Sequence, residues 1–262
     1  MHLKPYFLVF KANLAKDMSY RFNYLFAYAL HITRLLIYLA VWHLIFTQRS
    51  EILHYTWNEI ASYYALSTIV LLLLFPTHIF ELQPLIRKGT LNSILIKPLN
   101  IEANIFAKFL ASKLPVLLIM AVLTYLIFQL LGIKIQLDIS IFTIIFLFLS
   151  FSLAFYFGLF LSVLAFWLIE MWPIRRVFQG SMALFGGAIA PLDLLPNYIT
   201  SLAVWTPFPY FGYFNVKALQ GAISGRELQM HCLVVVAWVT VFVFAFKILW
   251  KLGLKRYEAV NL

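Results

Sequence analysis

The chain has 262 residues, of which 63% are hydrophobic and only 11% are charged. A soluble domain usually carries about 25% charged residues and could not hide so much apolar surface from water, so the composition excludes a soluble globular protein. The net charge of +10 lies in the connectors between apolar stretches, which argues against nucleic-acid binding, and the single Cys232 excludes an internal disulfide framework or a Cys-rich metal site.

Six apolar stretches are candidates for membrane spans, because a helix needs about 20 such residues to cross the bilayer core. They are residues 22–46, 60–80, 104–131, 139–169, 177–190 and 228–250. The fifth is short unless it extends back through residues 173–176. We therefore expect an all-α integral membrane fold with six transmembrane helices.

The distribution of Lys and Arg predicts the orientation. Fifteen of them lie in or beside one set of alternate connectors and four in the other set. The smaller set is Arg49, Lys134, Lys217 and Arg226. Since cytoplasmic loops carry the excess of basic residues, we expect a multi-pass protein of the cell (inner) membrane with both termini in the cytoplasm.

The chain is expected to form one transmembrane domain over residues 1–262. Residues 21–131 would hold helices 1–3, residues 138–250 helices 4–6, and residues 251–262 a cytoplasmic tail. Residues 1–20 precede the first span, and Phe7, Phe10, Leu14 and Met18 recur there at helical spacing. This pattern indicates a helix lying on the membrane surface; a plain extension of the first span is the alternative.

The longest polar connector on the basic side covers residues 81–103. Gly89 and Thr90 can start a short helix there, with Thr90 as the N-cap. Pro98 would end it after about two turns. Leu91, Ile94 and Leu95 would share one face of a helix too short to be stable alone. We therefore expect a partner to cover this apolar face, although a helix resting on lipid headgroups is an alternative.

The connector of residues 186–227, on the opposite side, is too hydrophobic for a plain loop and too rich in proline for a full span. It contains Gly187, Pro191, Asp193 and Pro196. A re-entrant pair of short helices fits this pattern, provided that protein rather than lipid covers its backbone.

Signatures of chemistry are absent from the sequence. It contains no phosphate-binding loop, no dinucleotide-binding glycine pattern and no H-E-x-x-H motif. We expect no catalytic residue and no metal ligand. The predicted spans also lack acidic residues, which argues against transport driven by protons or sodium ions. The remaining class of function is a transport pathway whose energy comes from another polypeptide.

Arg34 is the one basic residue deep within a predicted span. A single helical stripe carries Asn23, Ala27, His31, Arg34, Tyr38 and Trp42. Because a charge facing lipid is costly, we expect the stripe to face the interior of a dimer, with His31, Arg34 and Tyr38 lining a substrate pathway. The alternative is that Arg34 bonds helix carbonyls or a partner's carboxylate and never meets substrate.

Three segments resemble the ABC-2 type permeases of ABC exporters, in particular the branch of about 260 residues without a fused ATPase. The first is the run 86–99, Ile-Arg-Lys-Gly-Thr-Leu-Asn-Ser-Ile-Leu-Ile-Lys-Pro-Leu. The second is Gly187 with Pro-Leu-Asp-Leu-Leu-Pro at 191–196 and Pro-Phe at 207–208, which is similar to the family's re-entrant helices. The third is Gly-Leu-Lys-Arg-Tyr at 253–257.

The resemblance implies that the first segment docks on the ATPase. Its expected coupling residues are Arg87, Lys88, Gly89, Thr90, Leu91, Ile94, Leu95, Lys97 and Pro98. For the external gate the resemblance implies Gly187, Pro191, Asp193 and Pro196.

The resemblance further implies a homo- or heterodimer of permeases above two ABC ATPase subunits. ATP and Mg would bind to those subunits, so this chain would hold no cofactor and have no enzyme activity of its own. Two other interpretations stay open: a stand-alone channel or secondary carrier, and a membrane-embedded lipid-modifying enzyme.

Overall fold

The computed structural model describes residues 4–19, 21–48, 51–52, 55–96 and 99–260. Its helices are α1 Lys4–Ser19, α2 Arg21–Gln48, α3 Trp57–Leu74, η1 Thr77–Phe80, α4 Gln83–Arg87, α5 Asn92–Leu95, α6 Ile101–Leu130, α7 Ile141–Val163, η2 Leu164–Phe166, α8 Trp172–Phe185, η3 Leu192–Leu194, α9 Asn197–Val204, η4 Phe208–Phe211, α10 Tyr213–Leu219 and α11 Gly225–Val260. Within the described ranges the regular structure is helical apart from one isolated bridge between Ile52 and Tyr55. This agrees with the expected all-α fold.

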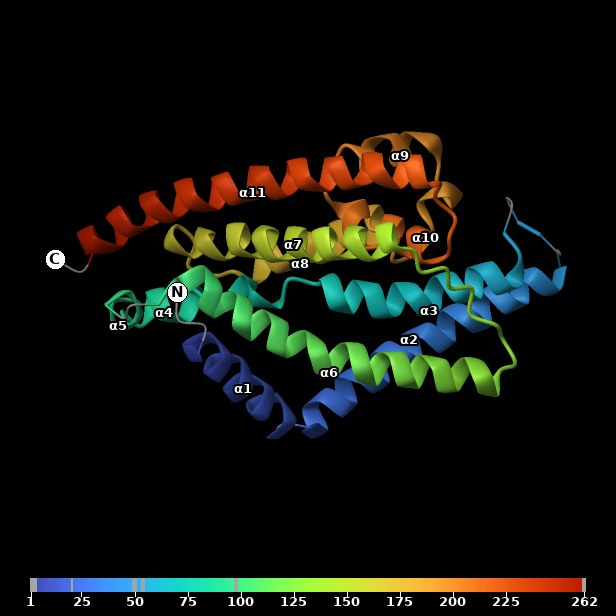
Figure 1. Ribbon diagram of the computed structural model, residues 1–262, viewed down its shortest axis with the longest axis horizontal. Coiled ribbons are helices and arrows are strands. Elements are labelled where there is room, and N and C mark those ends of the chain that lie inside the picture. The colour runs from blue at the N-terminus through green and yellow to red at the C-terminus, as the bar shows by residue number, and fades with distance from the viewer. Residues whose placement is uncertain (1–3, 20, 49–50, 53–54, 97–98, 261–262) are drawn as a thin grey trace.

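The long helices form an elongated bundle (Figure 1). α7 and α11 lie side by side along their length, α2 packs on α3, and α1 packs on α6. The start of α1, the short helices α4 and α5, and the end of α11 gather at one end of the bundle, which we call the basic end. α9 and α10 lie toward the other, the opposite end.

Five segments of the described chain are long and apolar enough to cross a membrane. They are Tyr28–Gln48, Trp57–Arg87, Ile101–Leu130, Ile141–Phe166 and Gly225–Tyr257. The predicted span 177–190 corresponds to α8, which does extend back to Trp172 but has only 14 residues. At 1.5 Å per residue α8 is roughly 21 Å long, less than the bilayer core of about 30 Å. The sixth span therefore remains a prediction.

Polar caps define where several helices begin. Thr56 and Glu59 form a reciprocal capping box at the start of α3, and Asn100 and Ser140 accept a backbone N–H at the starts of α6 and α7. These side chains satisfy N–H groups that have no partner within the helix. At these three helices the polar connector therefore sets where the apolar helix begins.

α3 ends at Leu74, just before Pro76. Pro76 has no N–H to donate to the carbonyl of Leu72, four residues earlier. The ammonium of Lys113, a buried residue of α6, donates instead to the carbonyl oxygens of Leu72 at 2.9 Å and Phe75 at 2.5 Å. The break in α3 is thus stabilised by a cation from a neighbouring helix.

The segment before the first span forms a separate helix, α1, that meets α2 at an angle (Figure 1). Tyr6 faces α6, and its hydroxyl accepts the N–H of Asn100 at 2.9 Å. Phe7 and Met18 are exposed. The structure thus describes α1 and α2 as two separate helices, and the position of α1 on a membrane surface stays a prediction.

Candidate coupling site

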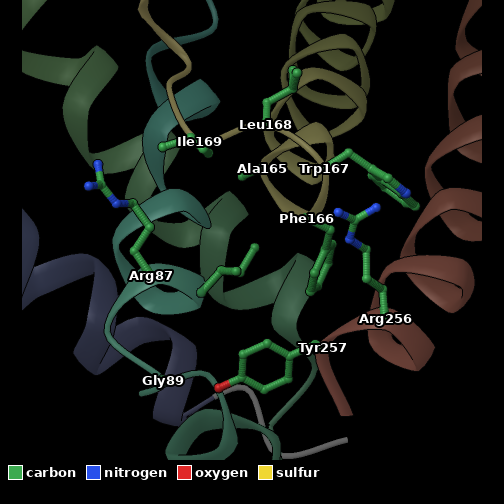
Figure 2. A pocket seen from close by; sticks show the side chains of 10 residues that line it. Arg87, Gly89, Ala165, Phe166, Trp167, Leu168, Ile169, Arg256 and Tyr257 are labelled. Carbon is green, nitrogen blue, oxygen red and sulfur yellow. The ribbon is translucent and has the colours of Figure 1, made fainter. Parts of the chain in front are cut away.

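Three segments distant in sequence meet at the basic end. They are α4 with the turn that follows it, the connector between α7 and α8, and the last turns of α11 (Figure 2). Together they line a cavity of about 330 Å³ that is partly open to the outside. Its lining residues are Ile86, Arg87, Gly89, Ala165, Phe166, Trp167, Leu168, Ile169, Arg256 and Tyr257. Two of the three segments that carry the family resemblance are therefore neighbours in space.

The turn after α4 depends on Gly89. Gly89 has a φ of +67°, a left-handed conformation that residues with a Cβ seldom adopt. Its N–H donates to the carbonyl of Ile86 at 3.1 Å, and the N–H of Thr90 donates to that of Leu85 at 3.0 Å. This pair of bonds is a Schellman cap. It ends α4 and turns the chain sharply into α5.

The structure corrects the predicted short helix in three respects. α5 is a single turn that starts at Asn92 after Leu91, so Thr90 is not its N-cap. Leu91 is fully buried at 0% exposure and cannot belong to a docking face, whereas Leu95 is 41% and Ile96 is 83% exposed. Ile94 is half-buried. The predicted residues Lys97 and Pro98 lie outside the described residues.

The burial of Leu91 has a plain cause. The Schellman turn points the chain back toward α4, because the N–H of Leu91 also donates to the carbonyl of Leu85 at 3.1 Å. Leu91 therefore faces inward, and the outward apolar positions are Leu95, the last residue of α5, and Ile96, which follows it. Ile96, which the sequence analysis did not place on the docking face, protrudes most.

An ion pair joins α4 to the connector before α8. Arg87 Nη1 lies 2.7 Å from Glu170 Oε1, and both side chains are about half exposed (54% and 53%). Gln83 adds hydrogen bonds from its amide to the carbonyl of Ile169 at 2.9 Å and to Glu170 Oε2 at 3.3 Å. Exposed ion pairs stabilise proteins by about 0.2–1 kcal/mol, so these contacts orient the segment more than they stabilise the fold. Lys88 is exposed and takes no part.

The last turns of α11 close the site from the third side. A Cβ at Gly253 would overlap the ring of Phe166, so glycine permits this close approach. The Phe166 ring also packs edge-on against Trp250 and Tyr257, and Arg256 lines the cavity (Figure 2). The glycine of the 253–257 motif thus has a packing role that the sequence alone did not reveal.

At the opposite end the prolines and Asp193 lie in a segment tied to α3. Tyr55 donates its hydroxyl to the carboxylate of Asp193 at 2.8 and 2.9 Å, and Lys217 Nζ lies 3.1 Å from the same carboxylate. Burial raises the pKa of Tyr55 above its usual value, and the Asp193 carboxylate raises it further. Pro191 is buried, whereas Pro196 is exposed. Tyr55 and Lys217 were not predicted.

Two tyrosines of α3 hold the backbone of the same segment. Tyr63 donates to the carbonyl of Gly187 at 2.7 Å and Tyr64 to that of Ile189 at 2.6 Å. Trp42 of α2 in turn donates to the Tyr64 hydroxyl at 2.8 Å. These bonds satisfy carbonyls of irregular backbone that would otherwise be costly to bury. The segment that contains the predicted external gate is therefore bonded directly to α3, at Gly187 and Ile189, and is connected to α2 through Tyr64.

The predicted stripe on α2 divides in the structure. Tyr38 stacks on Tyr64 of α3 at 4.8 Å and so packs inside the chain. Arg34 is exposed, with Nη2 at a long 3.5 Å from His31 Nδ1. The side chains of Asn23 and Ala27 lie outside the described residues. Lining of a pathway by Arg34 and His31 stays a prediction.

Comparison with known protein families identifies the family of the chain. A family model described as "ABC-2 family transporter protein" matches residues 32–260, which is most of the chain and includes the residues of the candidate coupling site. A search of curated proteins gave no match. The chain therefore belongs to the ABC-2 family, and it is a membrane permease of an ABC transporter.

Proposed function

We propose that this permease is the membrane subunit of an exporter and that it docks on a separate ATPase through the tip formed by Leu95 and Ile96. The observation that carries the proposal is the 83% exposure of Ile96 at the basic end. The tip is short, yet Leu91 anchors its root in the core and the Gly89 turn fixes its direction. An exposed apolar side chain, on a turn that is anchored in the core and flanked by basic residues, suits a groove in a soluble partner.

The basic end would face the cytoplasm, where ATP is available. Arg87 and Lys88 precede the tip in the chain, and Arg256 lines the same cavity as Arg87, in keeping with the positive-inside rule. The ATPase subunits would bind ATP and Mg, and a second permease, identical or different, would complete the pathway. The site would then lie in the inner membrane's cytoplasmic face.

Two helices could carry a displacement of the tip across the bundle. α4 follows α3 in the chain, and Arg87 pairs with Glu170, which lies just before α8. α3 holds the opposite-end segment through Tyr63 and Tyr64, and α8 runs directly into that segment. Closure of the ATPase dimer on ATP would shift both helices together. Packed bundles respond to such shifts by switching between discrete arrangements.

The test is Ile96→Asp, which would place a carboxylate in the apolar contact. Asn92→Asp is the matched control, since it adds the same charge to the same exposed turn. With the native ATPase co-expressed, we expect Ile96→Asp to lose at least tenfold in ATPase recovery and ATP-driven export, with membrane insertion unchanged. Asn92→Asp should behave like wild type.

Normal assembly and export by Ile96→Asp would overturn the docking role. Export that continues in vesicles without any ATPase would instead favour a secondary carrier.

A further inference from the structure

Arg175, near the start of α8, lies among aromatic rings beside the break in α3. The centre of its guanidinium is 5.6 Å from the ring centre of Phe75, 5.4 Å from that of Phe80 and 5.3 Å from that of Trp172. Phe80 and Trp172 also contact each other at 5.2 Å. A cation over aromatic faces is attracted by their quadrupoles, so the rings hold the guanidinium in place.

The rings leave the hydrogen-bond donors of Arg175 unused. Its Nε is buried and has no hydrogen-bond partner, and no carboxylate of the described chain pairs with the guanidinium. Arg87, Lys108 and Lys217 each contact an acidic side chain. A guanidinium has five N–H donors, and leaving a buried one such as Nε–H unbonded is unfavourable. The buried Nε–H of Arg175 therefore lacks an acceptor.

A cavity of about 80 Å³ adjoins this group. It is lined by Phe75, Pro76, Thr77, Ile79, Phe80 and Arg175. Roughly 10–15 Å³ is enough for one water molecule, so the cavity has room for a small acidic group.

The polar groups around the cavity leave Arg175 as its cation. Lys113, on the other side of the break, is already bonded to the carbonyls of Leu72 and Phe75. The hydroxyl of Ser112 donates to the carbonyl of Phe109, so the Thr77 hydroxyl is the donor in its 3.4 Å bond to Ser112. Arg175 thus supplies the free donors to a space whose other lining side chains, Thr77 apart, are apolar.

We propose that Arg175, held by the rings of Phe75, Phe80 and Trp172, binds the acidic group of an amphipathic anion, a phosphate or carboxylate on an apolar body, as the substrate entering from the basic end. The guanidinium can bind such a group through two parallel hydrogen bonds. Trp172 is 54% exposed and extends the apolar surface outward for the rest of the molecule. The assignment of the anion as a transported substrate rests on the proposed exporter function, whereas the binding of an anion at Arg175 does not.

The first experiment measures binding to the purified permease alone, in nanodiscs of phosphatidylcholine, with dodecyl phosphate as the probe. Quenching of tryptophan fluorescence gives the affinity, and dodecanol is the uncharged comparison. We expect dodecyl phosphate to bind at least tenfold more tightly than dodecanol. Arg175→Gln should lower the affinity for dodecyl phosphate at least tenfold and leave the affinity for dodecanol unchanged. Arg175→Lys should lower the affinity for dodecyl phosphate by an intermediate amount.

Arg176→Gln is the matched control, because Arg176 is the exposed neighbour on α8 and does not line the cavity. It should bind dodecyl phosphate like wild type. Unchanged affinity in a folded Arg175→Gln variant, shown by its thermal unfolding, would overturn the anion site. Because no ATPase is present, this result does not depend on the coupling proposal.

The second experiment separates a transported molecule from a resident lipid, since a phospholipid headgroup offers the same chemistry. Inverted vesicles containing the permease and its ATPase are given dodecyl phosphate. ATP-driven uptake that Arg175→Gln abolishes supports the substrate assignment. Arg175-dependent co-purification of anionic phospholipid, with no uptake of the probe, would overturn it and leave a lipid site.

Discussion

Lys113 supplies the hydrogen-bond donor that Pro76 lacks. Its ammonium, carried on α6, lies 2.9 Å from the carbonyl oxygen of Leu72, which in an unbroken helix would accept the N–H of residue 76. A buried cation thereby allows α3 to break at the proline without exposing its last carbonyls. The break in turn places Phe75 and Phe80 beside Arg175.

Replacing Lys113 should destabilise the protein by more than replacing its neighbour Lys108. Lys113→Met would leave a buried carbonyl without its donor, at a cost of about 1–3 kcal/mol. Lys108→Met would remove only a part-exposed pair with Glu81, worth about 0–1 kcal/mol. Thermal unfolding of the purified variants in detergent measures both. Equal unfolding temperatures for the two variants would contradict the role given to Lys113.

The Arg87–Glu170 pair should matter for coupling more than for stability. Arg87→Glu and Glu170→Arg each place like charges together, so we expect each to lower export per ATP hydrolysed several-fold. Each change should alter the free energy of unfolding by no more than about 1 kcal/mol, as for other exposed ion pairs. The double exchange restores an ion pair with reversed polarity and should recover much of the export. If the double variant is as poor as the worse single one, the pair does not link α4 to α8.

The bond between Tyr55 and Asp193 should make stability fall in alkaline solution. The folded-state pKa of Tyr55 is raised above its unfolded value of about 10, so the contribution is complete below about pH 10 and is lost as the pH rises beyond it. Tyr55→Phe should be less stable than wild type by about 1–3 kcal/mol at pH 8, and the gap should narrow above pH 10. Chemical unfolding at several pH values measures this.

Tyr198→Phe is the control for that experiment, since Tyr198 of α9 is exposed at the same end of the bundle. Its unfolding should follow wild type at every pH. A constant gap between wild type and Tyr55→Phe across the pH range would count against the raised pKa.

Labelling of single cysteines should reveal the orientation. In a Cys232→Ser background, Asn197→Cys at the start of α9 should react with an impermeant maleimide in intact cells. Lys255→Cys near the end of α11 should react only after permeabilisation, because the basic end is expected to face the cytoplasm. Both positions are exposed. The reverse pattern would invert the proposed topology.

The sequence alone determined the membrane class and the approximate positions of the long helices. These follow from composition and from the length of each apolar stretch, whereas the break of α3 before Pro76 was not predicted. The predicted span 60–80 fell on α3 and its break, and 104–131 fell on α6. Pro and Gly residues also occur in the segments that resemble the family.

Only the tertiary structure decided which faces are buried and which charges meet. Leu91 and Ile96 are both apolar, but the turn at Gly89 buries the first and exposes the second. Arg87 forms an ion pair with Glu170, and Asp193 accepts a hydrogen bond from Tyr55; in both pairs the partners are distant in sequence. In helices that are apolar on every side, the helical period does not distinguish a face covered by protein from one covered by lipid. That choice depends on neighbours brought together by packing, so residues such as Glu170, Lys217 and Arg175 could not be assigned before the fold was known.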